Sequence, residues 1–188
     1  MTAFTRHTPE TAPAPAGAQL AEIRQAWGFI PNLHATLAES PTALQGYDTL
    51  FGLVGQGTLT PAEQQVAFLT VSRINACEYC VSGHTVLAGA AKLEAASIAA
   101  LRDGTTLPDP KLEALARFTA AVVEQRGHLT DAETEAFLAA GYTRAQVLEV
   151  VLIVATKTIS NYVNHLTATP LDAFMAKTVW HAPTKHAA

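Results

Sequence analysis

Two cysteines and a histidine within eight residues are the part of this chain best suited to chemistry. In the segment "NACEYCVSGHT" they are Cys77, Cys80 and His84, spaced as CxxCxxxH. Residues three and four apart share one face of an α-helix, so this spacing brings the three side chains together. Asn75 is a good helix-capping residue, and the exposed N–H groups at a helix start favour a thiolate over a thiol. Both cysteines are therefore expected in the first two turns of a helix.

This arrangement suits thiol redox chemistry. His84, one turn beyond Cys80, could act on it as a base or as an imidazolium partner, since free imidazole titrates near neutral pH. A thiolate at Cys80 could attack a weak O–O bond and become a sulfenic acid. Cys77 would then capture that acid as a disulfide, and a dithiol reductant would restore both thiols.

Three other interpretations of the cluster remain open. A zinc site needs four ligands, and without a second CxxC or HxxxH the set would have to be completed by His165 or His34. A purely structural disulfide would close so short a loop that it stabilises little. Two cysteines buried by chance as small hydrophobic residues is the third interpretation.

The composition indicates one globular protein with few charged partners. Of 188 residues, 49% are hydrophobic and 15% charged, and the formal net charge is -4 at pH 7. No cluster of lysine or arginine is present, which argues against binding to nucleic acid or anionic lipid. The most apolar run, 147–155, is far shorter than a membrane span. We expect a soluble, cytoplasmic homo-oligomer in which thiols are kept reduced.

The chain divides into three parts. Residues 1–17 are rich in threonine, proline and alanine and predict a flexible N-terminal arm. Residues 18–180 are expected to form a single helical domain. Residues 181–188 are expected to form a flexible tail, in which His181 and His186 have no predicted role.

Start and stop signals predict an all-α fold of about eight helices. Apolar residues recur at helical spacing, and no segment alternates in the manner of a half-buried strand. Threonine stands three residues before glutamate or glutamine at Thr60, Thr130 and Thr143, which is the pattern of a capping box. The expected helices cover 18–27, a turn from 31, 41 to about 54, 61–74, a segment from 75 onwards, 92–102, 110–125, 130–141 and a long segment from 143.

Apolar stripes predict which helix faces are buried. The first stripe is Val66, Leu69, Val71 and Ile74, and the second is Leu148, Val151, Leu152 and Ala155. A weak internal repeat is also present: aligning His84 with His165 places Cys80 opposite Asn161. Such a repeat would record a duplicated helical unit in which one copy kept its thiols.

The segment "VAFLTVSRINACEYCVSGHT" at 66–85 resembles the core motif of the carboxymuconolactone decarboxylase/AhpD superfamily, in the alkylhydroperoxidase AhpD-like (peroxidase-related) branch. The segments "GFIPNLHATLAESP" at 28–41 and "SNYVNHLTATPLDAF" at 160–174 are similar to the same branch. The resemblance implies an AhpD-like helical fold built into homotrimers or homohexamers. It also implies a cofactor-free peroxidase that reduces hydroperoxides in antioxidant defence. Its electron donor would be a lipoyl-bearing or thioredoxin-like dithiol protein.

The resemblance also suggests a role for each residue. Cys80 matches the cysteine that attacks peroxide, Cys77 its resolving partner and His84 a relay histidine. Gln65 occupies the place of the family's relay glutamate; it cannot take a proton but could orient His84 through its amide. Tyr79 stands where the relay has a second histidine, and it is more often a packing residue.

The internal repeat and the missing relay acid give two further expectations. His165 and Asn161 could line the same pocket as the cysteines, although His165 also fits a role at a helix end. Because the relay lacks its acid, we expect modest peroxidase activity or a substrate other than simple alkyl hydroperoxides. The decarboxylases of the superfamily lack the cysteine pair. A dithiol/disulfide oxidoreductase or a redox sensor without peroxide specificity is the alternative function.

Overall fold

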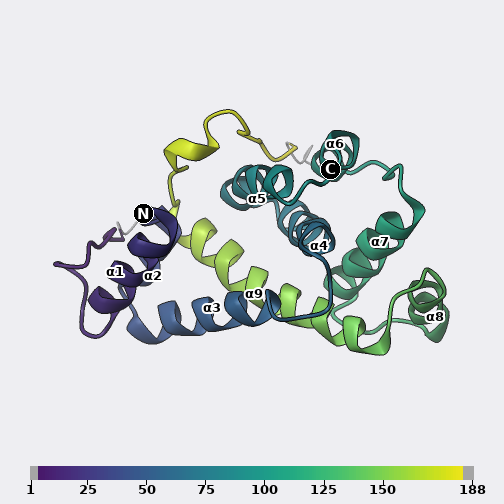
Figure 1. Cartoon of the computed structure of the whole chain (residues 1–188), viewed down its shortest axis with the longest axis horizontal. Coiled ribbons are helices and arrows are strands. Elements are labelled where there is room, and N and C mark those ends of the chain that lie inside the picture. Colours follow the sequence, from purple (N-terminus) through teal and green to yellow (C-terminus); the bar gives the residue numbers. More distant parts are fainter. Residues whose placement is uncertain (1–3, 184–188) are drawn as a thin grey trace, which may run out of the picture.

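The structure, a computed structural model, describes residues 4–183, and within them the fold is all-α, as the sequence predicted (Figure 1). It has nine α-helices where about eight were expected, a short 3-10 helix and no strand in the described part. The helices are α1 Ala16–Trp27, α2 Asn32–Leu37, α3 Pro41–Val54, α4 Pro61–Ile74, α5 Glu78–Ala90, α6 Ala95–Asp103, α7 Pro110–Glu124, α8 Asp131–Ala139 and α9 Arg144–Thr167, followed by η1 Ala173–Met175.

Most helix ends follow the sequence signals. The three capping boxes form at the starts of α4, α8 and α9, where each threonine accepts from the backbone three residues on. Gly28 ends α1 in the left-handed conformation. The helix expected from Lys92 instead begins at Ala95, because Lys92 has a φ of 60° and cannot continue a right-handed helix.

The turn between α4 and α5 differs from the prediction. Asn75 ends α4 rather than starting α5, and Cys77 is the N-cap residue of α5 rather than a residue inside it. Ala76 has a φ of 55°, and Cys77 N–H donates to Ser72 O at 2.9 Å. This is a Schellman motif with alanine in the place where glycine is usual. The motif sets Cys77 at the tip of the turn and Cys80 in the first turn of α5.

The longest helix connects the two ends of the molecule. Figure 1 shows α9 running from α8 at one end to α1 and α2 at the other, with α4 and α5 packed across its middle. The core has two parts, a larger one around α4, α7 and α9 and a smaller one that joins the N-terminal helices to the start of α5. Cys77 and Cys80 belong to the smaller part.

The buried face of α9 is not the one predicted. Leu148, Val151 and Ala155 are exposed, whereas the predicted α4 residues Val66, Leu69 and Val71 are buried. The buried residues of α9 are Val150, Ile153, Thr156, Lys157, Ser160, Asn161 and Asn164. The second half of this face is polar because it covers the cysteines, so apolar periodicity alone selected the wrong side of the helix.

Segments outside the helices are tied to the helical body. His7 N–H donates to Ala35 O at 2.9 Å, and its ring lies 2.8 Å from Glu39. Trp180 donates from its backbone to Ser82 Oγ at 3.1 Å. The division into an arm, a domain and a tail stays a prediction, and residues 1–3 and 184–188, with His186, lie outside the described residues.

No single helix between residues 4 and 183 has the length and apolar character to cross a membrane. The strongly bent pair α8 and α9 meets those two criteria only when its helices are taken together.

Candidate functional site

The two cysteines lie under the polar face of α9. Both are free thiols, with Cys77 1% and Cys80 3% exposed. Asn164 Nδ2 is 3.2 Å from Cys80 Sγ and 3.8 Å from Cys77 Sγ, and Ser160 Oγ is 3.9 Å from Cys80 Sγ. These polar groups are the kind of donors that stabilise a buried thiolate.

The surroundings make the two thiols unequal. Burial alone would oppose ionisation of Cys80, but a hydrogen bond from Cys77, the charge of Lys157 and hydrogen bonds from Asn161 and Ser160 hold its pKa well below the usual value. The pKa of Cys77 is raised, first by its hydrogen bond to Cys80 and then by burial. Cys80 is therefore the thiolate of the pair and Cys77 the protonated thiol.

His84 contacts Gln65, as predicted, but its other nitrogen meets Lys157 and not Cys80. Its Nδ1 lies 2.9 Å from Gln65 Oε1 and its Nε2 lies 2.9 Å from Lys157 Nζ. Because the amide oxygen only accepts, Nδ1 carries the proton and Nε2 accepts from the lysine. Burial, and then the charge of Lys157, lower the pKa of His84 well below the usual value, so the ring is neutral. Among the described residues no hydrogen bond joins His84 to Cys80.

Lys157 is a buried cation that sequence reasoning missed. Its side chain is 1% exposed, and no carboxylate in the described part of the chain pairs with it. Its Nζ also lies 5.7 Å from the centre of the Phe68 ring. An unpaired buried ammonium is costly, so the thiolate of Cys80 is the anion that balances it.

The remaining predicted residues have other contacts. Tyr79 donates to a carboxylate oxygen of Asp172 and accepts from the Leu33 backbone, so its hydroxyl is not directed at the cysteines. His165 is exposed, because the inward-facing Asn164 leaves its neighbour rotated by about 100°. The predicted pocket role of His165 is therefore not supported by the geometry. Glu63, the acid closest to Gln65 in the sequence, completes the capping box and pairs with Lys111 at 2.9 Å.

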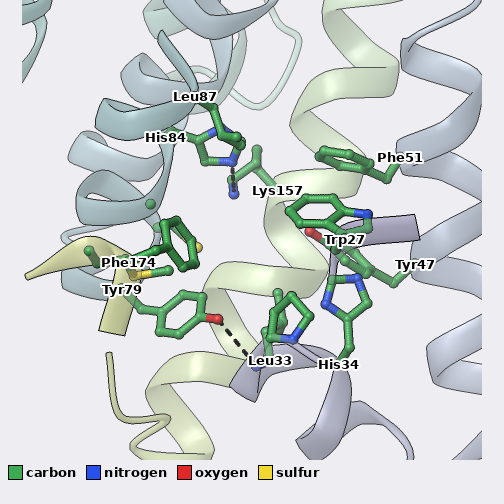
Figure 2. Close-up of a pocket in the computed structure, with 14 residues that line it drawn as sticks. Trp27, Leu33, His34, Tyr47, Phe51, Tyr79, His84, Leu87, Lys157 and Phe174 are labelled. Atoms are coloured by element: carbon green, nitrogen blue, oxygen red, sulfur yellow. Dashed lines mark hydrogen bonds between the residues drawn. The ribbon is translucent and has the colours of Figure 1, made fainter. Parts of the chain in front are cut away.

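Cys80 lines a small cavity of about 50 Å³ that opens to the surface. Figure 2 shows the rings of Trp27, Tyr47, Phe51 and Phe174 around it, with Lys157 and His84 at one wall. Cys77 is not among the lining residues. The cavity therefore presents the thiolate to an apolar or aromatic compound and keeps the second thiol behind it.

The polar stripe on α9 was a signal that the sequence did contain. Lys157, Ser160, Asn161 and Asn164 recur at helical spacing, directly after the most apolar run of the chain. Of these only Asn161 was considered; it lies beside Cys80, and its Oδ1 accepts from Asn75 Nδ2 at 2.9 Å. Within residues 4–183, no three His, Cys, Asp or Glu side chains gather as a metal site would require.

Comparison with known proteins agrees with this fold. Residues 41–108 match the sequence model of the carboxymuconolactone decarboxylase family. Comparison with curated proteins finds no match. An uncharacterised peroxidase-related protein of Ralstonia eutropha JMP134, described as an alkylhydroperoxidase AhpD core, has a TM-score of 0.81 at 20% identity over 93% of this chain and 96% of its own.

Two further structures share the fold. A peroxidase-related protein of Silicibacter sp. TM1040 has a TM-score of 0.76 at 17% identity, with 87% of this chain and 88% of its own covered. The debrominase Bmp8, bound to 2,3,4-tribromopyrrole, has a TM-score of 0.72 at 20% identity, with 95% and 96% covered.

The site and fold define a helical protein with a buried dithiol. Residues 41–108 resemble the carboxymuconolactone decarboxylase family in sequence, as the motif indicated, and the chain shares its fold with AhpD-like peroxidase-related proteins. The proteins named in these comparisons include a debrominase, so the fold supports more than one chemistry.

Proposed function

We propose that the protein is a cofactor-free thiol peroxidase that reduces organic hydroperoxides through Cys80 and Cys77. One observation carries the proposal: Cys80, the thiolate of the pair, lines an aromatic cavity, while Cys77 is hydrogen-bonded to Cys80 and does not line the cavity. A peroxidase needs this order, because the attacking sulfur must meet the substrate and the resolving sulfur must meet only the sulfenic acid.

In the first step, the Cys80 thiolate attacks the outer oxygen of R–O–O–H. The O–O bond breaks, Cys80 becomes a sulfenic acid, and the alkoxide takes a proton to leave as an alcohol. Lys157 supplies that proton, because the charge of its ammonium stabilises the thiolate and no carboxylate of the described residues pairs with it. His84, held by Gln65, positions the lysine by accepting one of its N–H groups.

In the second step, the Cys77 thiol attacks the Cys80 sulfur. A disulfide forms, and water leaves with the hydroxyl of the sulfenic acid and the proton of Cys77. An external dithiol then reduces the disulfide and returns two protons, one of which restores the charge of Lys157. We propose a lipoyl-bearing or thioredoxin-like protein as this donor and the cytoplasm, where thiols stay reduced, as the setting.

We also propose that the protein works as a homotrimer or homohexamer. The α9 face exposed in the single chain includes Leu148, Val151, Tyr162 and Leu166, at 69%, 49%, 56% and 73% exposure. These residues repeat at helical spacing and form an apolar surface on a chain with little charge. A second copy of the chain is the partner that buries such a face.

The aromatic cavity favours a second candidate, reductive dehalogenation. The Cys80 thiolate would take halogen from an aromatic ring as a sulfenyl halide, the ring would gain a proton, and Cys77 would displace halide to give the same disulfide. The debrominase with this fold supports this candidate. The third candidate function, which uses the same pair of cysteines, is dithiol/disulfide exchange or redox sensing without turnover.

Steady-state turnover separates these candidates. With dihydrolipoamide as donor, the wild type should consume cumene hydroperoxide, and Cys77→Ser and Cys80→Ser should each lower the rate by roughly 100-fold or more. Turnover retained in both variants would contradict the peroxidase. Faster reaction with a bromophenol or with a small disulfide as the oxidant would assign the protein to one of the other functions.

A further inference from the structure

A second histidine faces the cavity and has no role in the steps above. His34 of α2 is 6% exposed and lines the same cavity as Cys80. Its ring packs against Trp27 at 6.1 Å and Tyr47 at 5.5 Å between centroids. Figure 2 shows it on the cavity wall below Trp27 and beside Leu33.

The neighbours of His34 fix which nitrogen carries its proton. Its Nε2 lies 3.1 Å from Asp48 Oδ1, and the other oxygen of Asp48 accepts from Gln19 Nε2 at 2.7 Å. A carboxylate oxygen has no proton to donate, so in the neutral imidazole the proton lies on Nε2, toward Asp48, and Nδ1 has a lone pair. This Nδ1 is buried and has no hydrogen-bond partner among the described residues.

A buried acceptor without a partner is uncommon in folded proteins, and this one is held in place by the contact of Nε2 with Asp48 and by aromatic packing. Tyr47 links it to the thiols: burial, and then the charge of Cys80, raise the pKa of this tyrosine, which packs on His34. His34, Tyr47 and Cys80 all line one cavity. A ligand can contact both His34 and Cys80.

We infer that His34 Nδ1 is a ligand-binding group that accepts a hydrogen bond from an O–H or N–H of the substrate. The preferred ligand is a compact apolar or aromatic compound with one such donor, held against the rings of Trp27 and Phe51 that line the cavity. Where the proposed function holds, the donor is the O–H of the hydroperoxide and of the alcohol formed from it. This inference deepens that function and rests on it for the identity of the ligand.

Binding of unreactive ligands to Cys80→Ser protein tests the inference without any turnover. The probes are 2-phenyl-2-propanol, the alcohol derived from cumene hydroperoxide, and its methyl ether, which lacks the O–H. Trp27 lines the cavity, so its fluorescence reports binding. The alcohol should bind about fivefold or more tightly than the ether, since the ether leaves Nδ1 unpaired.

Two variants show that His34 causes the preference. His34→Phe in the same background removes the acceptor and keeps an aromatic ring, so alcohol and ether should bind equally well. Asp48→Asn lets the imidazole carry its proton on Nδ1, which should also lower the preference. This second variant guards against a folding defect in the first.

Three results would overturn the inference: equal affinities in the Cys80→Ser parent, a preference that survives His34→Phe, or no binding of either probe. A failure of the peroxidase assay with a clear alcohol preference would reject the proposed function and leave this binding role intact. An active peroxidase without that preference would reject the binding role of His34 and leave the proposed function intact.

Discussion

At the scale of single residues, the positive charge beside Cys80 comes from a lysine and not from a histidine relay. Lys157 lies on a helix 73 residues beyond His84, which it contacts at 2.9 Å. The absence of an acid at Gln65 therefore need not disable the thiolate, because Lys157 supplies the stabilising charge. Gln65 alone is therefore no longer a reason to expect weak peroxidase activity.

Lys157→Met should slow the reaction of Cys80 with hydroperoxide at pH 7 by about tenfold or more, because the thiolate loses its cation. The pH dependence of this rate shows whether the thiolate is already formed at neutral pH. The lowered pKa of Cys80 means that its thiolate is already formed at neutral pH, so the wild-type rate should change little on going to higher pH. In the variant the thiol must first ionise, and the rate should rise through the usual thiol range. Stopped-flow rates across pH measure both.

Lys177→Met, at an exposed lysine, is the matched control and should leave the rate unchanged. His84→Gln provides a comparison, because His84 acts here through Lys157 and its loss should cost less than the loss of the lysine. A larger loss in His84→Gln would show that the histidine is the base, as the sequence first suggested.

At the scale of elements, the α4–α5 turn sets the spacing of the thiols. Local signals predicted many helix starts, since capping boxes such as Thr60 to Glu63 act within three residues. The Schellman motif at Ala76 was missed because its usual mark, glycine, is absent. The roles of Lys157 and His34 could not be predicted, since they arise when α2 and α9 pack against α5.

Ala76→Gly should stabilise the fold by about 1 kcal/mol, because alanine at a φ of 55° is strained and glycine is not. Chemical denaturation midpoints measure the effect. Ala99→Gly, in the exposed middle of α6, should instead destabilise by about 1 kcal/mol. A loss of stability in Ala76→Gly would show that the turn does not favour glycine.

At the scale of the whole molecule, the proposed assembly would bury the exposed apolar face of α9. Light scattering should give the mass of a trimer or a hexamer for the wild type, against 19.9 kDa for one chain. Leu166→Glu should lower that mass, since a charge buried between copies is costly. Val179→Glu, at an exposed apolar residue outside α9, is the control and should assemble normally. A monomeric wild type would contradict the proposed assembly.

The most direct test of the central claim counts free thiols. Reduced protein has two per chain, and one equivalent of cumene hydroperoxide should remove both. In Cys80→Ser the single remaining thiol, Cys77, should survive the same treatment for far longer, because burial still opposes its ionisation and it does not line the cavity. If both wild-type thiols persist, or if Cys77 in the variant is lost as quickly as the wild-type pair, Cys80 is not the peroxide-attacking thiolate.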